Sequence, residues 1–446
     1  MTPAASPAAP GVSPAAPTDP SAVPAEVVER VVRTLTDRLA ASAGDPDEDA
    51  AAQRRRASAL LDEELDRIAA DALSSGRRVL APEQEAHLRA QVLARVCGLG
   101  GLEALLAEPG VQNINITGER VVVDFGGGRR EQRPPVAAGD ADLIALVRRI
   151  AATSGTGERR FDASAPLLSM ELGDGSRLSA VMDVSRRVAV AIRRHPDQAL
   201  TMDDLQASGM VDATARRLLA AAVGARLNVL IAGATGAGKT TLLRALAYAA
   251  IPPTERLITI EDSLELGLDR AHPECVAMQA RPANIEGAGE ITLAELVRHA
   301  LRMSPDRVIV GETRGPETIA LLNAMSMGTD GSMATIHASS SQGAFTKIAA
   351  YTAQAPERLG LEATNLLIAS AVHLVVHIAS GPHGARRVAS IREVVGAEGA
   401  QVASNEIYRR TGGEPGALVV PPGPATATAL AACGFDSARE YAGGAW

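Results

Sequence analysis

The residues best suited to chemistry lie at positions 233 to 241, which read Gly-Ala-Thr-Gly-Ala-Gly-Lys-Thr-Thr. This GxxxxGK[ST] pattern stands between an apolar run and a helical pattern, the context in which it forms a phosphate-binding loop. Glycines let the backbone wrap closely round a phosphate chain, and the helix N-terminus points unpaired amides at its charge. Lys239 would reach the β and γ phosphates, and the Thr240 hydroxyl would bind Mg²⁺. The predicted loop consists of Gly233, Ala234, Thr235, Gly236, Ala237, Gly238, Lys239, Thr240 and Thr241.

Acidic residues follow two further apolar runs downstream of this loop. Glu261 and Asp262 come after the run 257–260, with Glu265 close behind, and Glu312 follows the run 307–310. Phosphoryl transfer needs carboxylates near the metal and near the attacking water. Acids at strand ends are often only solvated loop charges, but two such strands after a phosphate loop favour a catalytic role. The candidate metal ligands are Thr240, Glu261 and Glu312.

A histidine and two arginines complete the set of candidates. His337 follows the run 333–336, at a strand end where ligands of α/β sheets bind. It could sense or donate to the γ phosphate, and a hydrogen-bonded loop residue is an equally good reading. Arg177 and Arg193 lie on strands that precede the phosphate-loop domain, and an arginine from another domain commonly stabilises a transferring phosphoryl group. A solvated strand face would explain both arginines as well.

Shifts in composition divide the chain into five segments. Helical periodicity in the second predicts three amphipathic helices, and continuous apolar runs alternating with helices in the fourth predict a buried, mainly parallel α/β sheet. The third reads as a small α+β domain of short strands with one helix, around 141–154. The expected segments are a disordered Pro/Ala-rich tail at 1–24, helices at 25–99, the α+β domain at 100–200, the α/β domain at 201–408 and a flexible tail at 409–446.

Composition excludes several classes of protein. The 446 residues carry a formal charge of −8, which argues against a protein that coats nucleic acid. Three widely spaced cysteines form neither a disulfide framework nor a paired-cysteine zinc site. We find no signal-peptide pattern and no apolar run of the roughly 18 residues that span a membrane. These features favour a cytoplasmic protein.

Four ordered motifs resemble the type II/IV secretion traffic ATPases, and the chain is most similar to the CpaF-like branch of tight-adherence pili. The resemblance extends over residues 99–395. The four-cysteine zinc subdomain of the GspE-like branch is absent, which disfavours that branch. The motifs are the phosphate loop, Ile258-Thr-Ile-Glu-Asp262 with Glu265-Leu266, the segment 290–315 that contains Gly311-Glu312, and Asp330-Gly-Ser-Met-Ala-Thr-Ile-His337-Ala338.

This resemblance implies a RecA-like P-loop motor domain, preceded by an α+β N-terminal domain, in a ring of six identical subunits that uses ATP and Mg²⁺. By the same resemblance Glu312 would position or activate water, and Arg177 and Arg193 would clamp the γ phosphate. Thr329 and Ser339 depart from the family pattern at the rim of the site. The remaining residues that the family motifs assign to catalysis are Glu261, Asp262, Glu265 and His337.

We therefore expect an Mg-dependent ATPase on the inner face of the cell membrane that powers assembly or secretion of pilin-like subunits through an inner-membrane platform. The helices of 25–99 would dock on that platform, or simply form part of the ring. One alternative is a conjugation-type traffic ATPase, and another is a nucleotide-binding scaffold without turnover. A nucleic-acid motor is disfavoured by the acidic charge and the scarcity of aromatic residues, so no direct nucleic-acid binding is expected.

Overall fold

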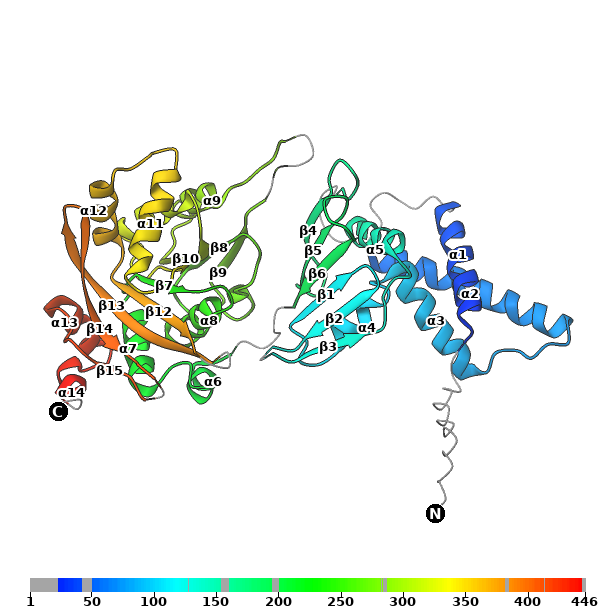
Figure 1. The fold of residues 1–446 in the computed structure, drawn as a ribbon, viewed down its shortest axis with the longest axis horizontal. Helices are drawn as coiled ribbons and strands as arrows, with labels where there is room; N and C mark the ends of the chain where they lie inside the picture. Colours follow the sequence, from blue (N-terminus) through cyan, green and yellow to red (C-terminus); the bar gives the residue numbers. More distant parts are fainter. Residues whose placement is uncertain are drawn as a thin grey trace, which may run out of the picture. The chain divides into compact units, whose positions relative to one another are not determined.

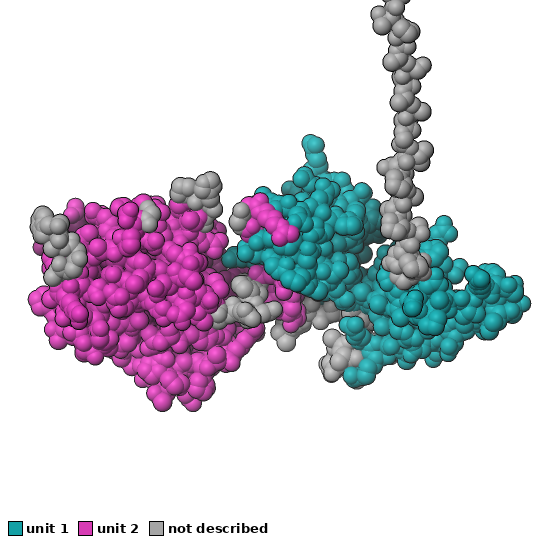
Figure 2. All heavy atoms as spheres, turned by 90° about the horizontal axis from the view of Figure 1, so that it is seen from below, with its two compact units in different colours: residues 1–125, 130–170, 178–193 teal, residues 126–129, 171–177, 194–446 magenta. Residues whose placement is uncertain are grey.

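The structure, a computed structural model, forms two compact units (Figure 2). The first contains residues up to 125, 130–170 and 178–193, and the second contains 126–129, 171–177 and 194 onward. The segment 1–22 of the expected disordered tail lies outside the described residues. None of the described helices combines the length and the apolar character needed to cross a membrane. The residues that the structure describes are 23–41, 50–126, 128–153, 160–194, 200–281, 283, 287–381, 385–412 and 414–442.

Three helices lead into the first unit: α1 (Ala25–Ala41), α2 (Ala50–Ser74) and α3 (Pro82–Cys97). Each repeats an apolar residue at intervals of three or four positions, which gathers these side chains on one helical face. The three faces pack against one another and form a small core of their own. Its buried members are Val28, Val31, Leu35, Leu61, Leu65, Leu88 and Val92.

A six-stranded sheet, in the order β3-β2-β1-β6-β5-β4, forms the rest of the first unit. The expected small α+β domain is thereby confirmed, although two of its strands had no clear sequence signal. One of them, β3, reads Arg-Glu-Gln-Arg and is an edge strand without buried residues, so it lacks apolar alternation. The elements are α4 (Leu102–Ala107), β1 (Asn113–Thr117), β2 (Arg120–Asp124), β3 (Arg130–Arg133), α5 (Asp140–Thr153), β4 (Leu167–Glu171), β5 (Arg177–Val181) and β6 (Ala189–Arg193).

The second unit is built on a nine-stranded sheet in the order β15-β14-β13-β12-β7-β11-β10-β8-β9 (Figure 1). The strands from β12 to β9 run parallel, and β13, β14 and β15 extend the sheet in antiparallel fashion. The strands are β7 (Val229–Gly233), β8 (Leu257–Glu261), β9 (Cys275–Gln279), β10 (Arg307–Thr313), β11 (Met333–His337), β12 (Leu374–Ser380), β13 (Arg386–Glu398), β14 (Gln401–Arg409) and β15 (Ala417–Leu418).

Helices cover both faces of this sheet, which is why its central strands read as continuous apolar runs. Along β7, Val229 and Ile231 join a core with α6, α7 and α8, whereas Leu230 and Ala232 join a second core with α9 to α12. This arrangement confirms the expected RecA-like α/β class. The helices are α6 (Met202–Ala207), α7 (Ala213–Gly224), α8 (Lys239–Ala250), α9 (Leu293–Ala300), α10 (Glu317–Ser326), α11 (Gly343–Gln354) and α12 (Leu361–Ala371).

The C-terminal segment corrects one expectation: residues 409–446 were expected to form a flexible tail, and the part that is described is folded. β15 pairs with β14, and two short helices follow, α13 (Pro424–Ala432) and α14 (Ser437–Ala442). Leu418, Leu430 and Phe435 are buried in the same core as α7 and α8. The high Gly and Pro content of this segment lies in its turns, while a few well-placed apolar side chains hold it to the domain.

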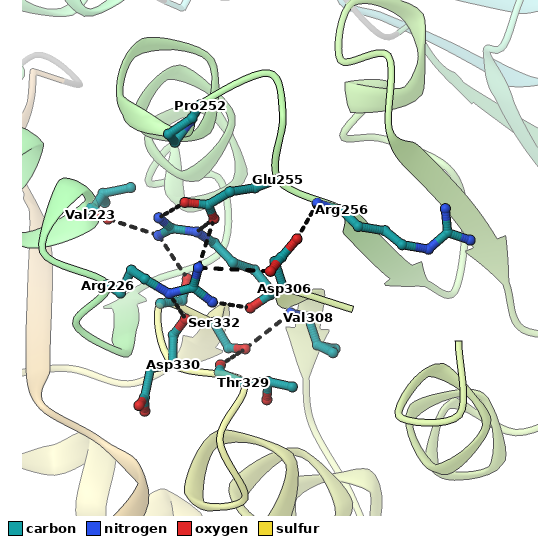
Figure 3. Close-up of polar contacts among 12 residues, drawn as sticks. Val223, Arg226, Pro252, Glu255, Arg256, Asp306, Val308, Thr329, Asp330 and Ser332 are labelled. Atoms are coloured by element: carbon teal, nitrogen blue, oxygen red, sulfur yellow. Dashed lines mark hydrogen bonds and ion pairs between the residues drawn. The ribbon is translucent and has the colours of Figure 1, made fainter. Parts of the chain in front are cut away.

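A buried ionic cluster joins the strands at the edge of the sheet where β8 and β10 begin (Figure 3). The Arg307 side chain is fully buried; it is paired with Glu255 and donates a hydrogen bond of 2.8 Å to the Val223 carbonyl. Nearby, Arg226 donates to the backbone carbonyl oxygens of Asp306 and Asp330, at 2.6 and 3.2 Å. The cluster therefore ties the turn before β7 to the starts of β10 and β11.

Candidate nucleotide-binding and catalytic site

The site lies at the edge of the nine-stranded sheet where the parallel strands end. In the observed register Gly233 of β7 is opposite His337 of β11, and β10 is aligned with both β8 and β11 up to Val310, after which its register with β11 shifts. Because parallel strands finish at the same edge, the predicted residues after β7, β8, β10 and β11 come together there. This arrangement brings Lys239 and Glu312 each into contact with His337.

The phosphate loop connects β7 to α8, and its residues 234–236 are exposed. Gly236 and Gly238 have φ values of 71° and 92°, in the left-handed region that favours glycine. α8 begins at Lys239, so Gly238 is its N-cap, and the amides of the first turn face the loop. Thr240 and Thr241 are half-buried in this turn. The conformation suits an anion bound at the start of the helix.

Lys239 is 94% buried and its ammonium group is held inside the loop. Its Nζ donates to the Ala234 carbonyl oxygen at 3.1 Å and lies 3.2 Å from Nδ1 of His337. Thr235 places its hydroxyl 3.5 Å from the same ring nitrogen. Both donors face Nδ1, so that atom acts as an acceptor.

His337 links the lysine to the acidic residue of β10. Its Nε2 is 2.8 Å from Oε1 of Glu312. Burial and the Lys239 ammonium group lower the pKa of His337 below its usual 6.5, against the opposing charge of Glu312. At neutral pH the ring is therefore neutral, with its proton on Nε2, and it donates to Glu312 while accepting from Lys239. The result is a continuous polar chain from lysine through histidine to glutamate.

Glu261, the last residue of β8, is a buried acid. Its Oε2 accepts hydrogen bonds from the backbone amides of Glu265 and Leu266, at 2.8 and 2.9 Å. Burial raises the pKa of Glu261 to about 7 even though these two hydrogen bonds favour the charged form. Gly311 of β10 packs against this side chain, because a Cβ there would lie 2.9 Å from Cγ of Glu261. The carboxyl group is thus positioned rigidly between β8 and β10.

Two residues that the sequence analysis did not select hold the turn after β10. Glu317 is buried, and its Oε1 accepts from the backbone amides of Arg314 and Gly315, at 2.6 and 2.7 Å. Arg314 forms an ion pair with Asp262 and so joins the ends of β10 and β8. The signal for Glu317 was its place at the start of a helix directly after the Gly311-Glu312 strand, where a carboxylate binds free amides.

The other predicted acids and arginines do not take part in the contacts from Lys239 through His337 to Glu312. Asp262 carries its charge in the pair with Arg314, and Glu265 supplies a backbone amide to Glu261. Arg177 begins β5 and Arg193 ends β6 of the six-stranded sheet. Their role toward the phosphate loop therefore stays a prediction.

The oxygen donors around the loop fit Mg²⁺ in type, since this ion prefers hydroxyl and carboxylate oxygens and keeps several waters. Thr240 and Glu312 would supply such oxygens, and Glu261 could use only Oε1, because Oε2 already accepts two amides. Within the described part of the chain, no three His, Cys, Asp or Glu side chains gather to hold a metal. A bound Mg²⁺ would then take its other ligands from water and phosphate.

The second unit is a P-loop nucleotide-binding domain of the RecA-like class. Its phosphate loop follows the first strand of a parallel sheet that has helices on both faces, and acidic residues lie at the ends of neighbouring strands. Residues 157–412 match the family model "Type II/IV secretion system protein". The chain belongs to this family. Membership in a family of secretion ATPases supports ATPase activity in general terms.

Individual relatives carry names from conjugation and type IV secretion. A Mycobacterium tuberculosis protein, whose name assigns it provisionally to conjugal transfer, is 37% identical over 312 residues, covering 68% of this chain and 86% of that protein. The type IV secretion system protein PtlH of Bordetella pertussis is 30% identical and covers 62% of this chain and 88% of PtlH. Among solved structures, the VirB11 ATPase of the Brucella suis type IV secretion system is 27% identical, covers 65% and 94% of the two chains, and has a TM-score of 0.35.

Proposed function

We propose that this protein hydrolyses ATP in an Mg-dependent reaction and uses the energy to drive a secretion or pilus machine. The observation that carries the proposal is the contact chain from Lys239 through His337 to Glu312 at the mouth of the phosphate loop. A lysine alone would suit a binding site. A glutamate coupled to it through a neutral histidine adds a group that can orient water and accept a proton.

In this proposal the loop amides and Lys239 bind the β and γ phosphates, and Lys239 exchanges its contacts with Ala234 and His337 for phosphate oxygens. The Glu312 carboxylate orients the attacking water. His337 keeps Glu312 in place through its Nε2 hydrogen bond. Mg²⁺, held by Thr240, Glu312 and one oxygen of Glu261, would neutralise charge on the phosphates when bound.

We further propose that six subunits form a ring at the inner face of the cell membrane, as in the CpaF-like branch, and that they act on pilin-like subunits through an inner-membrane platform. Arg177 and Arg193 would then contact the γ phosphate from the N-terminal domain. Loss of that phosphate on hydrolysis would release the bridge between domains and allow motion. The first three helices are candidates for contact with the platform.

A conjugation-type traffic ATPase is the second candidate, favoured by the names of the relatives. The Mycobacterium tuberculosis protein and TrbB of Rhizobium radiobacter, which is 30% identical over 268 residues, are both named for conjugal transfer. The two functions share the ATPase reaction and differ in cargo. Genes for pilins and a platform beside this gene would favour the first, and genes for a relaxase and a coupling protein would favour the second.

The reaction is tested by Mg-dependent phosphate release from the purified protein, with its mass measured in the same buffer. The wild type is expected to turn over ATP at a mass near six times 46.0 kDa. Glu312→Gln should keep nucleotide binding and lose about 100-fold or more in turnover, because it lacks the basic carboxylate. Lys239→Ala should lose binding as well. A wild-type ring that binds nucleotide without turnover, also in the presence of its membrane partner, would instead indicate a scaffold.

A further inference from the structure

We propose that Arg386, the first residue of β13, is an additional phosphate-binding residue that contacts the α or β phosphate of the nucleotide. This inference rests on the proposed nucleotide-binding function. Neither the phosphate-loop motif nor the acidic strand ends point to this residue. It is found through the position of the β12–β13 pair beside the loop.

Strand register places Arg386 at the edge of the sheet where the phosphate loop begins. β12 runs parallel to β7, with Ile378 opposite Gly233, the residue at which the loop starts. Two residues further along β12, Ser380 is opposite Arg386. The chain therefore returns from this edge into β13 immediately beside the loop.

The Arg386 side chain lies against the N-terminus of α8. A Cβ built on Gly238, the N-cap residue, would lie 3.7 Å from Cδ of Arg386 and 3.0 Å from Cε of Met210. The neighbouring Val388 amide donates to the Met210 carbonyl oxygen at 2.8 Å, which fixes the start of β13 against this segment. The carbon stem of Arg386 thus lies beside Gly238, close enough to touch a side chain placed at this position, and Gly238 is the N-cap of the helix whose first amides would face phosphate.

The Arg386 guanidinium is also available for a ligand. Arg386 is exposed, and it forms no side-chain hydrogen bond or ion pair with any described residue. Asp212, two residues after Met210, already has other partners: its Oδ2 accepts from the Tyr408 hydroxyl and the Gly416 amide, both at 2.6 Å, and its Oδ1 accepts from the Ala215 amide. A planar, permanently charged guanidinium that has no partner among the described residues and lies beside a phosphate loop is suited to bind phosphate oxygens.

The position of Arg386 predicts which phosphates it contacts. Gly238 precedes Lys239, so its surroundings face the phosphates nearest the helix N-terminus, which ADP and ATP share. Loss of Arg386 should therefore weaken the binding of ADP and of ATP by the same factor. An arginine that reads only the γ phosphate, the role proposed for Arg177 and Arg193, would affect ATP and leave ADP unchanged.

The test measures binding of fluorescent ADP and ATP analogues, with Mg²⁺, to the full-length wild type, Arg386→Gln and Arg386→Lys. Arg386→Gln is expected to raise both dissociation constants about tenfold, the usual effect of losing one charge-assisted hydrogen bond. Arg386→Lys should recover part of the loss. Arg298→Gln, which removes an exposed arginine of α9, is the control and should bind like the wild type. Melting temperatures without nucleotide should be equal for all four proteins.

Pyrophosphate competition separates phosphate binding from stacking on the base. If Arg386 binds phosphate, Arg386→Gln should weaken the binding of pyrophosphate by the same factor as the binding of ADP. Unchanged pyrophosphate affinity, or unchanged ADP affinity, would overturn this inference while the proposed function stands. Absence of nucleotide binding by the wild type would overturn the proposed function and this inference together.

Discussion

Glu261 lies in a position that is electrostatically unfavourable for a charged carboxylate. It is buried at the end of β8, near the acids Glu265 and Asp269, and only two backbone amides stabilise its charge. Its pKa is raised from 4.5 to about 7. Between these values the folded protein holds a proton that the unfolded chain has lost, so stability present at low pH is lost as the pH rises through about 7.

Glu261→Gln should remove this pH dependence, because glutamine does not titrate, and its amide oxygen can still accept the two backbone hydrogen bonds. Relative to the variant, the wild type is expected to lose about 2 to 4 kcal/mol of unfolding free energy between about pH 4.5 and pH 8, since each pKa unit corresponds to about 1.4 kcal/mol. Calorimetry across this range without nucleotide or Mg²⁺ would detect it. Parallel stability curves for the two proteins would show that the folded-state pKa is not raised.

Single residues were predictable where the chemistry is local. Lys239 belongs to a contiguous motif, and Glu312 and His337 follow strands whose ends must share one edge of a parallel sheet. Arg386 and the Arg314–Asp262 pair were not predictable, because their significance depends on neighbours distant in sequence. One arginine among 42 has no individual signature in the sequence.

At the level of elements, β10 is the strand on which the site most depends, and Arg307 anchors its start. The arginine is fully buried and contacts Glu255 and the carbonyl oxygens of Val223 and Gly331. From sequence it reads as a solvated charge before an apolar run. The strands themselves were predictable from their continuous apolar character, whereas the charged groups that align their starts were not.

Arg307→Met should lower the unfolding free energy of the second unit by about 3 to 5 kcal/mol, because it removes the buried guanidinium that pairs with Glu255 and its hydrogen bonds to the Val223 and Gly331 carbonyl oxygens, leaving Glu255 with the partly exposed Arg226. Arg226→Gln is the matched control: its side chain is 37% exposed, and its loss should cost about 1 kcal/mol. Chemical denaturation of both variants is the measurement. Equal, small losses would indicate that water replaces the missing contacts at Arg307.

On the scale of the whole molecule, the second unit is larger than the α/β domain predicted from the sequence. It includes a C-terminal segment whose composition predicts a flexible tail. Composition averaged over 38 residues concealed the contribution of Leu418, Leu430 and Phe435, because many Gly and Pro residues surround them. The RecA-like class itself was predictable, since it depends on long periodic segments.

Phe435→Ala should destabilise the second unit by about 3 to 5 kcal/mol, as expected for truncation of a buried aromatic side chain. Tyr441→Ala, which truncates a 44% exposed aromatic in the following helix, should change stability by no more than about 0.5 kcal/mol. Thermal unfolding followed by calorimetry distinguishes them. A Phe435→Ala protein that melts like the wild type would restore the view of a loosely attached tail.

The parallel register of β7, β10 and β11 also determines where this chain can change its length. An extra residue inside β10 or β11 would move Glu312 or His337 by roughly 3.3 Å and turn the side chain to the opposite face of the sheet. At the other edge, where the strands start, only loops that contribute no residue to the buried Arg307 cluster can lengthen without disturbing the contacts that Lys239 and Glu312 make with His337. We therefore expect insertions and deletions to be harmful inside the ends of β10 and β11, and to be tolerated in loops that belong neither to the site nor to the Arg307 cluster.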